Sequence, residues 1–179
     1  MKKQLTINAI NRTIGTLMVV VGVKKLRQAQ SEFTTTDTSN NKFYQALKSR
    51  GIDVKFSPKD ITYRYTSWEN WQKIIKVING IVKHFKWESE VFDCDNRSDF
   101  ASALTSLVFR INTLGKIHCS VFDAESDKFL YGHWANILVD IDDNLYLFDL
   151  DQSGMCQKIT SNNCVMGRLK YRFKQIIIN

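Results

Sequence analysis

The hydrophobic period of this sequence changes at Gly115, and that change constrains the fold more than any other feature. Before Gly115, apolar residues recur every three to four positions, which is the period of a helix with one buried face. After it, apolar and polar residues alternate through Ile117, Cys119 and Val121. The segments ANILVDI and LYLFDL then flank a polar turn, as in a β-hairpin. The sequence therefore predicts an α+β fold, in which N-terminal helices are followed by an antiparallel sheet.

Three helices are expected in the main domain before the change of period. A short one lies near residues 42–49. The strongest begins after Ser67, a residue type that caps helix N-termini, and continues to about residue 85. The third carries an apolar stripe over residues 94–112. The C-terminal segment VMGRLKYRFKQIII is expected to add strand to the sheet.

The first 41 residues are predicted to form an N-terminal arm in front of a domain that spans residues 42–179. With 179 residues and 44% hydrophobic content, the chain can bury a substantial core. Its beginning has helical spacing, and the segment QSEFTTTDTSNN that follows has the composition of a polar linker. We expect this helical arm to dock on another protein or on another subunit of a larger assembly.

The apolar run at residues 13–23 does not predict a membrane anchor. TIGTLMVVVGV is too short to span a bilayer, and no small-x-small cleavage site follows it. A packed or partner-binding helix is the favoured interpretation, and membrane association is not expected.

Charge is divided unevenly along the chain, although the formal total is +7. Residues 91–154 hold 4 Lys and Arg against 11 Asp and Glu. Such a segment repels a phosphate backbone, and the basic residues elsewhere are scattered over the sequence. A nucleic-acid partner is therefore not expected.

The four cysteines show no CxxC pair and no regular spacing; they are Cys94, Cys119, Cys156 and Cys164. We expect neither a metal site nor a cofactor. Reduced thiols are predicted, which corresponds to a reducing cytoplasm or to the interior of a viral particle.

A cysteine, a histidine and two carboxylates are candidates for one site. Cys94 begins a predicted helix, where unpaired backbone N–H groups and the helix dipole favour a thiolate. His133 opens a predicted strand and suits a general base. Asp149 and Asp151 both lie at the end of the next strand, where either could orient the imidazole. Strand geometry alone leaves the choice between the two aspartates open.

These residues stand in three short motifs, DCDNRSDFA, GHWANILVD and LYLFD. Their order resembles that of the transglutaminase-like superfamily of papain-type cysteine enzymes, especially the bacterial transglutaminase-like cysteine proteinases. The resemblance covers roughly residues 61–152. It implies a transglutaminase-like (papain-like) core, with the cysteine at a helix N-terminus and the histidine and aspartate on adjacent strands.

The resemblance also implies a thiol-dependent hydrolase or acyl transferase that acts on peptide or protein substrates. Cys94 would attack an amide or ester carbonyl, His133 would take and return the proton, and Asp149 would orient His133. The alternative is a catalytically silent structural or assembly protein of the same fold, such as a phage or virion component. Enzyme and scaffold share the fold, so the sequence leaves that choice open.

Overall fold

The computed structural model describes residues 35–39, 41–58 and 60–178. The predicted N-terminal helix lies outside these residues, and the domain boundary at residue 41 stays a prediction. Thr35–Ser39, inside the expected linker, forms strand β1, which pairs antiparallel with β3 (Thr62–Thr66).

The helices begin where the apolar period places them. They are α2 (Asn41–Lys48), α3 (Trp68–Val82) and α4 (Cys94–Leu104). Ser67 caps α3, and its side chain accepts a hydrogen bond from the Asn70 amide. The third helix is shorter than predicted: it passes into a π-helical turn at Thr105–Phe109 and stops at Arg110, whose φ is 55°. Hydroxyl groups of Ser102 and Thr105 bond to carbonyls one turn back, a pattern that bends helices.

Seven strands form the main sheet. In addition to β2 (Lys55–Pro58), they are β4 (Leu114–Asp123), β5 (Phe129–Val139), β6 (Leu145–Asp149), β7 (Met155–Ile159), β8 (Asn163–Met166) and β9 (Leu169–Ile178). The order is β2-β9-β4-β5-β6-β7, and β8 pairs with β9 on the edge that β2 also uses. The change of period at Gly115 coincides with the start of β4, although β2, earlier in the chain, also belongs to this sheet.

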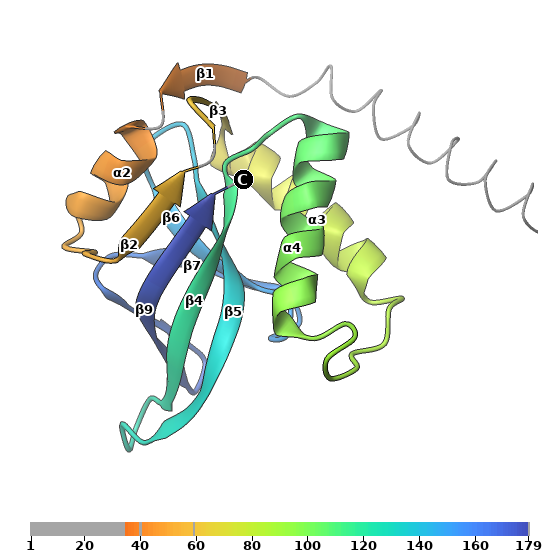
Figure 1. Cartoon of the computed structure of the whole chain (residues 1–179), viewed down its shortest axis with the longest axis vertical. Coiled ribbons are helices and arrows are strands. Elements are labelled where there is room, and N and C mark those ends of the chain that lie inside the picture. The colour runs from red at the N-terminus through yellow and green to blue at the C-terminus, as the bar shows by residue number, and fades with distance from the viewer. Residues whose placement is uncertain (1–34, 40, 59, 179) are drawn as a thin grey trace, which may run out of the picture. The chain divides into compact units, whose positions relative to one another are not determined.

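The sheet curls back on itself (Figure 1). Because β8 contacts β7 as well as β9, the six strands β4 to β9 form a nearly closed, barrel-like wall. Register shifts in β4, at His118/Cys119 against β9 and at Val121/Phe122 against β5, add local twist to that strand. Side chains of α2, including Phe43 and Leu47, join residues of the strands in one core.

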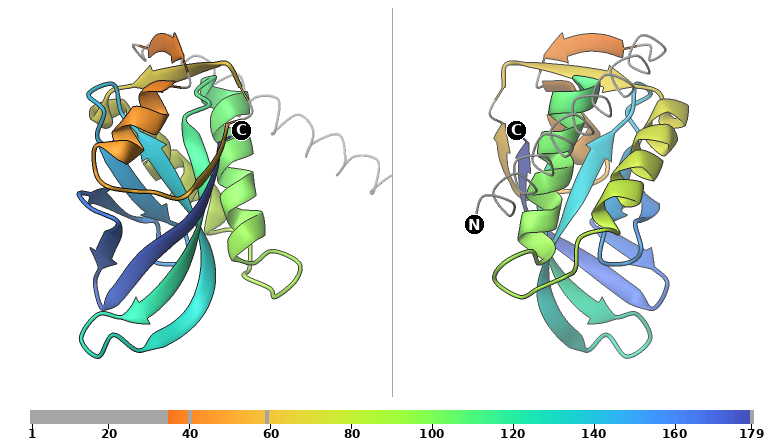
Figure 2. Two further views of the ribbon diagram at one scale, coloured as in Figure 1. Left: turned by 60° about the vertical axis from the view of Figure 1, so that its left-hand side comes forward. Right: turned by 90° about the vertical axis from the view of Figure 1, so that its right-hand side faces the viewer.

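The predicted fold class is wrong. The part of the chain that the structure describes is mostly β, with a barrel-like sheet and three short helices, and it is not the transglutaminase-like α+β core that we expected. Local periodicity located the helices and strands, but the curl comes from pairings between distant segments, which periodicity does not encode. Helices α3 and α4 pack on one side of this sheet (Figure 2), and α4 contacts β4 and β5. The start of α4 thereby lies beside the middle of β5.

Candidate functional site

Cys94 is the first residue of α4 and is partly buried. The helix begins after Asp93, whose side chain makes no capping bond to the first turn and accepts instead from the Glu90 amide. The amides of the first turn therefore lack a side-chain cap from Asp93, and their dipole acts on the thiol at the same end of the helix.

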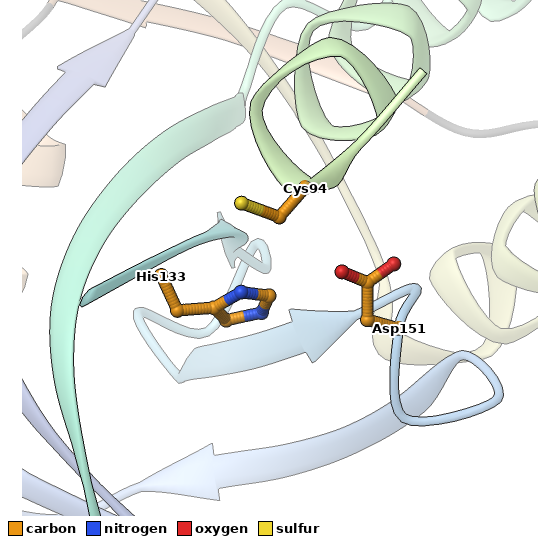
Figure 3. Close-up of side chains that lie close together, drawn as sticks. All are labelled: Cys94, His133 and Asp151. Atoms are coloured by element: carbon orange, nitrogen blue, oxygen red, sulfur yellow. The ribbon is translucent and has the colours of Figure 1, made fainter. Parts of the chain in front are cut away.

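His133 lies in β5 and is 95% buried. Its Nε2 atom is 3.0 Å from Oδ2 of Asp149. Because Nε2 contacts this carboxylate, the other ring nitrogen, Nδ1, is the one available to face Cys94. Three side chains meet here, those of Cys94, His133 and Asp151 (Figure 3). The Sγ atom of Cys94, one ring nitrogen of His133 and one carboxylate oxygen of Asp151 lie within 4.8 Å of one another.

Strand register brings Asp149 rather than Asp151 to the histidine. The simplest pairing across the turn would place Asp151 opposite residue 135. In the structure Asn136 pairs with Phe148, so the residue opposite position 135 is Asp149. The register is thus displaced by two residues, and Asp149 lies next to residue 135, diagonally from His133. Of the two carboxylates that sequence reasoning left open, Asp149 makes the contact with the imidazole.

Asp149 is buried, and hydrogen bonds satisfy both of its oxygens. Oδ2 accepts from His133 and, at 2.7 Å, from the hydroxyl of Tyr171, while Oδ1 accepts from the Asp151 amide at 2.9 Å. Burial works against ionisation, but the bonds from His133, Tyr171 and Asp151 outweigh it and lower the pKa of this carboxyl. A carboxylate held in this way fixes the orientation of the imidazole.

The environment of His133 favours the imidazolium. Burial disfavours the charged ring, but the interactions with Asp149 and Cys94 outweigh burial and raise its pKa to about 10. A positively charged ring beside a thiol stabilises a thiolate. The arrangement can therefore hold a thiolate and an imidazolium side by side.

Asp151 bonds to a cation and not to the histidine. Nη1 of Arg97 lies 2.6 Å from its Oδ1, and both side chains are partly buried. Arg97 is three residues beyond Cys94 on α4, so the two side chains lie on the same face of the helix. The ion pair consequently stands next to the thiol.

A groove of about 460 Å³ opens over these residues. Its lining includes two aromatic residues that are exposed to solvent, Trp87 at 51% and Tyr131 at 41%. The groove is lined by Trp87, Cys94, Arg97, Tyr131, Gly132, His133 and Asp151. Cys94, His133 and Asp151 thus line the same depression as two exposed aromatic rings.

Sequence reasoning missed several residues of this site. Arg97 had a usable signal, because its spacing of three from Cys94 places both on one helix face. Trp87 lies between α3 and α4, outside any periodic segment, and Tyr171 reaches Asp149 from β9. Only the folded chain shows that these two belong to the site.

Burial affects the three remaining cysteines. Burial raises the pKa of Cys119, and it raises that of Cys156 to about 12 and that of Cys164 to about 11. No disulfide joins any of the four, all of which lie in the described ranges. Three of the thiols are therefore poor nucleophiles near neutral pH.

Within the described ranges, no helix combines the length and the apolar character needed to cross a bilayer.

No protein-family model matches this chain, and no curated protein matches it by sequence. Solved structures do match. One is a Polyporus squamosus lectin bound to the human-type influenza-binding epitope Neu5Aca2-6Galb1-4GlcNAc, with a TM-score of 0.55 and 14% identity over 79% of this chain. Another is described as the PSL1a-E64 complex, with a TM-score of 0.52 and 16% identity over 79% of this chain.

The chain spans about half the length of these two structures, 49% of the lectin and 51% of PSL1a. At such low identity the likeness shows a shared fold and nothing finer. Binding of a glycan is a property of the lectin.

These neighbours overturn three predictions. The chain is not assigned to the transglutaminase-like superfamily, because its structural likeness is to a lectin and to PSL1a. The thiol-dependent hydrolase or acyl transferase, which rested on that resemblance, is wrong on the same finding. So is the alternative of a silent phage or virion component, for which neither neighbour gives support. The motifs DCDNRSDFA, GHWANILVD and LYLFD were too short to identify a family, although their residues do converge.

Proposed function

We propose that the groove beside α4 binds a carbohydrate. The observation that carries this proposal is the combination of two exposed aromatic rings, Trp87 and Tyr131, with the Arg97–Asp151 ion pair in one depression. Exposed tryptophan and tyrosine side chains offer rigid apolar faces at a low entropic cost.

The chemistry of the groove suits a sugar. One face of a pyranose ring presents C–H groups, which pack on an aromatic ring, while its hydroxyls both donate and accept hydrogen bonds. Arg97 offers donors and Asp151 offers acceptors close to the rings. A few polar groups between apolar walls are typical of sites that orient a small ligand.

The likeness to a lectin supports the proposal and suggests the first probes. The lectin's glycan ends in Neu5Ac, a sugar acid whose carboxylate a guanidinium can bind. Arg97 is such a guanidinium, so we use both an acidic and a neutral glycan.

Binding is tested by isothermal titration and saturation-transfer NMR with Neu5Aca2-6Galb1-4GlcNAc and with Galb1-4GlcNAc. We expect Trp87→Ala and Tyr131→Ala each to weaken binding about tenfold or more, because an aromatic ring stacked on a ligand contributes about 1–2 kcal/mol. Phe129→Ala is the matched control, since Phe129 is an exposed aromatic residue on the strand that carries Tyr131 but does not line the groove.

If neither glycan binds, or if the two groove variants bind as well as the control variant, a carbohydrate site in this groove is excluded. Binding of the acidic glycan alone, lost in Arg97→Gln, would identify the sugar carboxylate as the recognised group.

A second proposal concerns the predicted site residues, namely that Cys94 is a reactive thiol activated by His133, which Asp149 orients. The specific observation in its favour is the 3.0 Å contact of His133 with Asp149, together with the Cys94 thiol at a helix N-terminus near the same ring. This proposal concerns the nucleophile and assigns no substrate.

Iodoacetamide alkylation, followed at each cysteine by mass spectrometry at pH 7, tests this second proposal. Cys94 should react at least about tenfold faster than Cys119, Cys156 or Cys164, whose pKa values burial raises. His133→Ala and Asp149→Asn should both slow the reaction at Cys94. Equal rates at Cys94 and Cys156, or a rate that neither variant changes, would rule out an activated thiol.

A further inference from the structure

Three side chains that line the groove, all of types that bind metal ions, converge from separate elements, as Figure 3 shows. Cys94 comes from the start of α4, His133 from β5, and Asp151 from the segment just after β6. One ligand atom of each lies within 4.8 Å of those of the other two. Because the residues are 39 and 18 positions apart in sequence, only the fold assembles them.

The donor set indicates the class of metal. A thiolate, an imidazole nitrogen and a carboxylate oxygen are the ligands that Zn²⁺ takes in proteins, whereas Ca²⁺ and Mg²⁺ prefer oxygen. Three protein ligands leave a fourth tetrahedral position, and all three of these residues line the groove. A zinc ion in this place would meet water or a ligand from the groove.

Asp149 preorganises two of the three ligands. Its Oδ2 accepts from Nε2 of His133, which turns the other ring nitrogen toward Cys94, and its Oδ1 accepts from the backbone N–H of Asp151. Zinc-binding histidines are commonly held by a carboxylate in this way, and loss of that carboxylate weakens metal binding. The hydroxyl of Tyr171 also donates a hydrogen bond to Oδ2 of Asp149.

The distances are close to those that a zinc ion requires. Bonds of about 2.0–2.3 Å place tetrahedral ligands roughly 3.3–3.8 Å apart, so the donors need to approach by about 1 Å. Cys94 and Asp151 are only partly buried and can adjust, while His133 is held in place. Arg97 opposes a cation but occupies only Oδ1 of Asp151, which leaves Oδ2 as the ligand.

We propose that Cys94, Nδ1 of His133 and Asp151 bind one Zn²⁺ ion, with Asp149 positioning two of these ligands. The proposal does not depend on carbohydrate binding. It does compete with thiol reactivity, since a zinc ion bound to Cys94 would block alkylation there.

The experiment uses the full chain stripped of metal, titrated with Co²⁺ as a spectroscopic probe and then with Zn²⁺ in competition. We expect one equivalent of Co²⁺ to give thiolate charge-transfer and tetrahedral d–d absorption, which Zn²⁺ removes. Cys94→Ala should abolish the charge-transfer band, and Asp151→Asn, which preserves the shape of the side chain, should weaken binding at least tenfold. Asp149→Asn should weaken it about 10- to 100-fold.

Cys156→Ala is the control, because Cys156 is another partly buried thiol that does not belong to this cluster, and the variant should bind as the unaltered chain does. Circular dichroism on each variant separates loss of metal from loss of fold. Absence of a thiolate band, or binding that survives unchanged in both Cys94→Ala and Asp151→Asn, overturns the proposal. A folded Asp151→Asn variant with full affinity would likewise overturn the three-ligand site.

Discussion

At the scale of single residues, Asp149 is the group on which the site depends. A carboxylate that is almost fully buried is costly unless charged or polar partners satisfy it. Here one oxygen accepts from His133 and Tyr171, and the other accepts from the Asp151 amide. The same bonds that allow its burial also set the direction of the imidazole.

His133 and His118 should titrate very differently. In the metal-free protein, nitrogen-15 NMR of the imidazoles should show His133 protonated up to about pH 10, while burial lowers the pKa of His118 below 6.5. Asp149→Asn should lower the pKa of His133 and leave that of His118 in place. A His133 that deprotonates near pH 6.5 in the unaltered protein would contradict this account of the pair.

This raised pKa has a consequence for stability. Because the folded-state pKa of His133 exceeds the usual 6.5, the pair contributes stability that is fully present below about pH 6.5 and is lost as the pH rises toward 10. Urea unfolding in chelating buffer should therefore show the protein losing free energy of unfolding between these values. Asp149→Asn should show a smaller loss over the same range.

At the scale of elements, Asn136 joins α4 to the sheet. Its Nδ2 donates to the Ser98 carbonyl and the Ser102 hydroxyl on α4, and to the Gly115 carbonyl on β4. Since α4 carries Cys94 and β5 carries His133, this amide helps to set the thiol against the ring. A structural role of this kind agrees with its position on β5, where it alternates away from His133.

Replacement of this amide tests its role as a connector. Asn136→Ala should lower the free energy of unfolding by about 1–3 kcal/mol, because the buried hydrogen-bond partners of the amide lose its donors. The Oδ1 atom of Asn136 is buried without a partner, and its removal offsets part of that loss. Chemical denaturation measures the change, with Asn163→Ala on the exposed side of β8 as the control that should change stability little. An equal effect in both variants would show that Asn136 does not couple the helix to the sheet.

At the scale of the whole described domain, the curled sheet depends on close approach of its strands at Gly115. A Cβ atom at this position would lie 2.9 Å from the Ile177 carbonyl oxygen and 2.9 Å from Cγ1 of Ile178, both on β9. The backbone of β9 cannot move away without disturbing its pairing with β4 and β2. The residue that marks the change of period in the sequence is thus also where the packing tolerates no side chain.

Two glycine replacements separate packing from backbone entropy. Gly115→Ala should destabilise the protein by about 1–3 kcal/mol through overpacking. Gly80→Ala, in helix α3 with no atom within 4 Å of the added carbon, should instead stabilise it by roughly 0.5–1 kcal/mol. Thermal unfolding measures both, and a neutral Gly115→Ala variant would mean that β9 is free to yield.

By itself, the sequence determined the local structure and the types of residue in the site. Helical spacing predicted α2, α3 and the start of α4, because a helix face that packs on a core repeats about every 3.6 residues wherever it lies. Alternation of apolar and polar residues predicted the strands after Gly115, because successive side chains of a strand point to opposite faces of the sheet. The cysteine at a helix start, the histidine on a strand and the two candidate aspartates could also be read from their places in these elements.

The tertiary structure alone decided the rest. A two-residue displacement in the pairing of β5 with β6 chose Asp149 for the histidine and left Asp151 to Arg97. Pairing of β9 with β4 and β8 curled the sheet and overturned the predicted α+β class. Register, curvature and the approach of Trp87 and Tyr171 all depend on contacts between residues far apart in the chain. Such contacts have no local period, so no pattern of neighbouring residues predicts them.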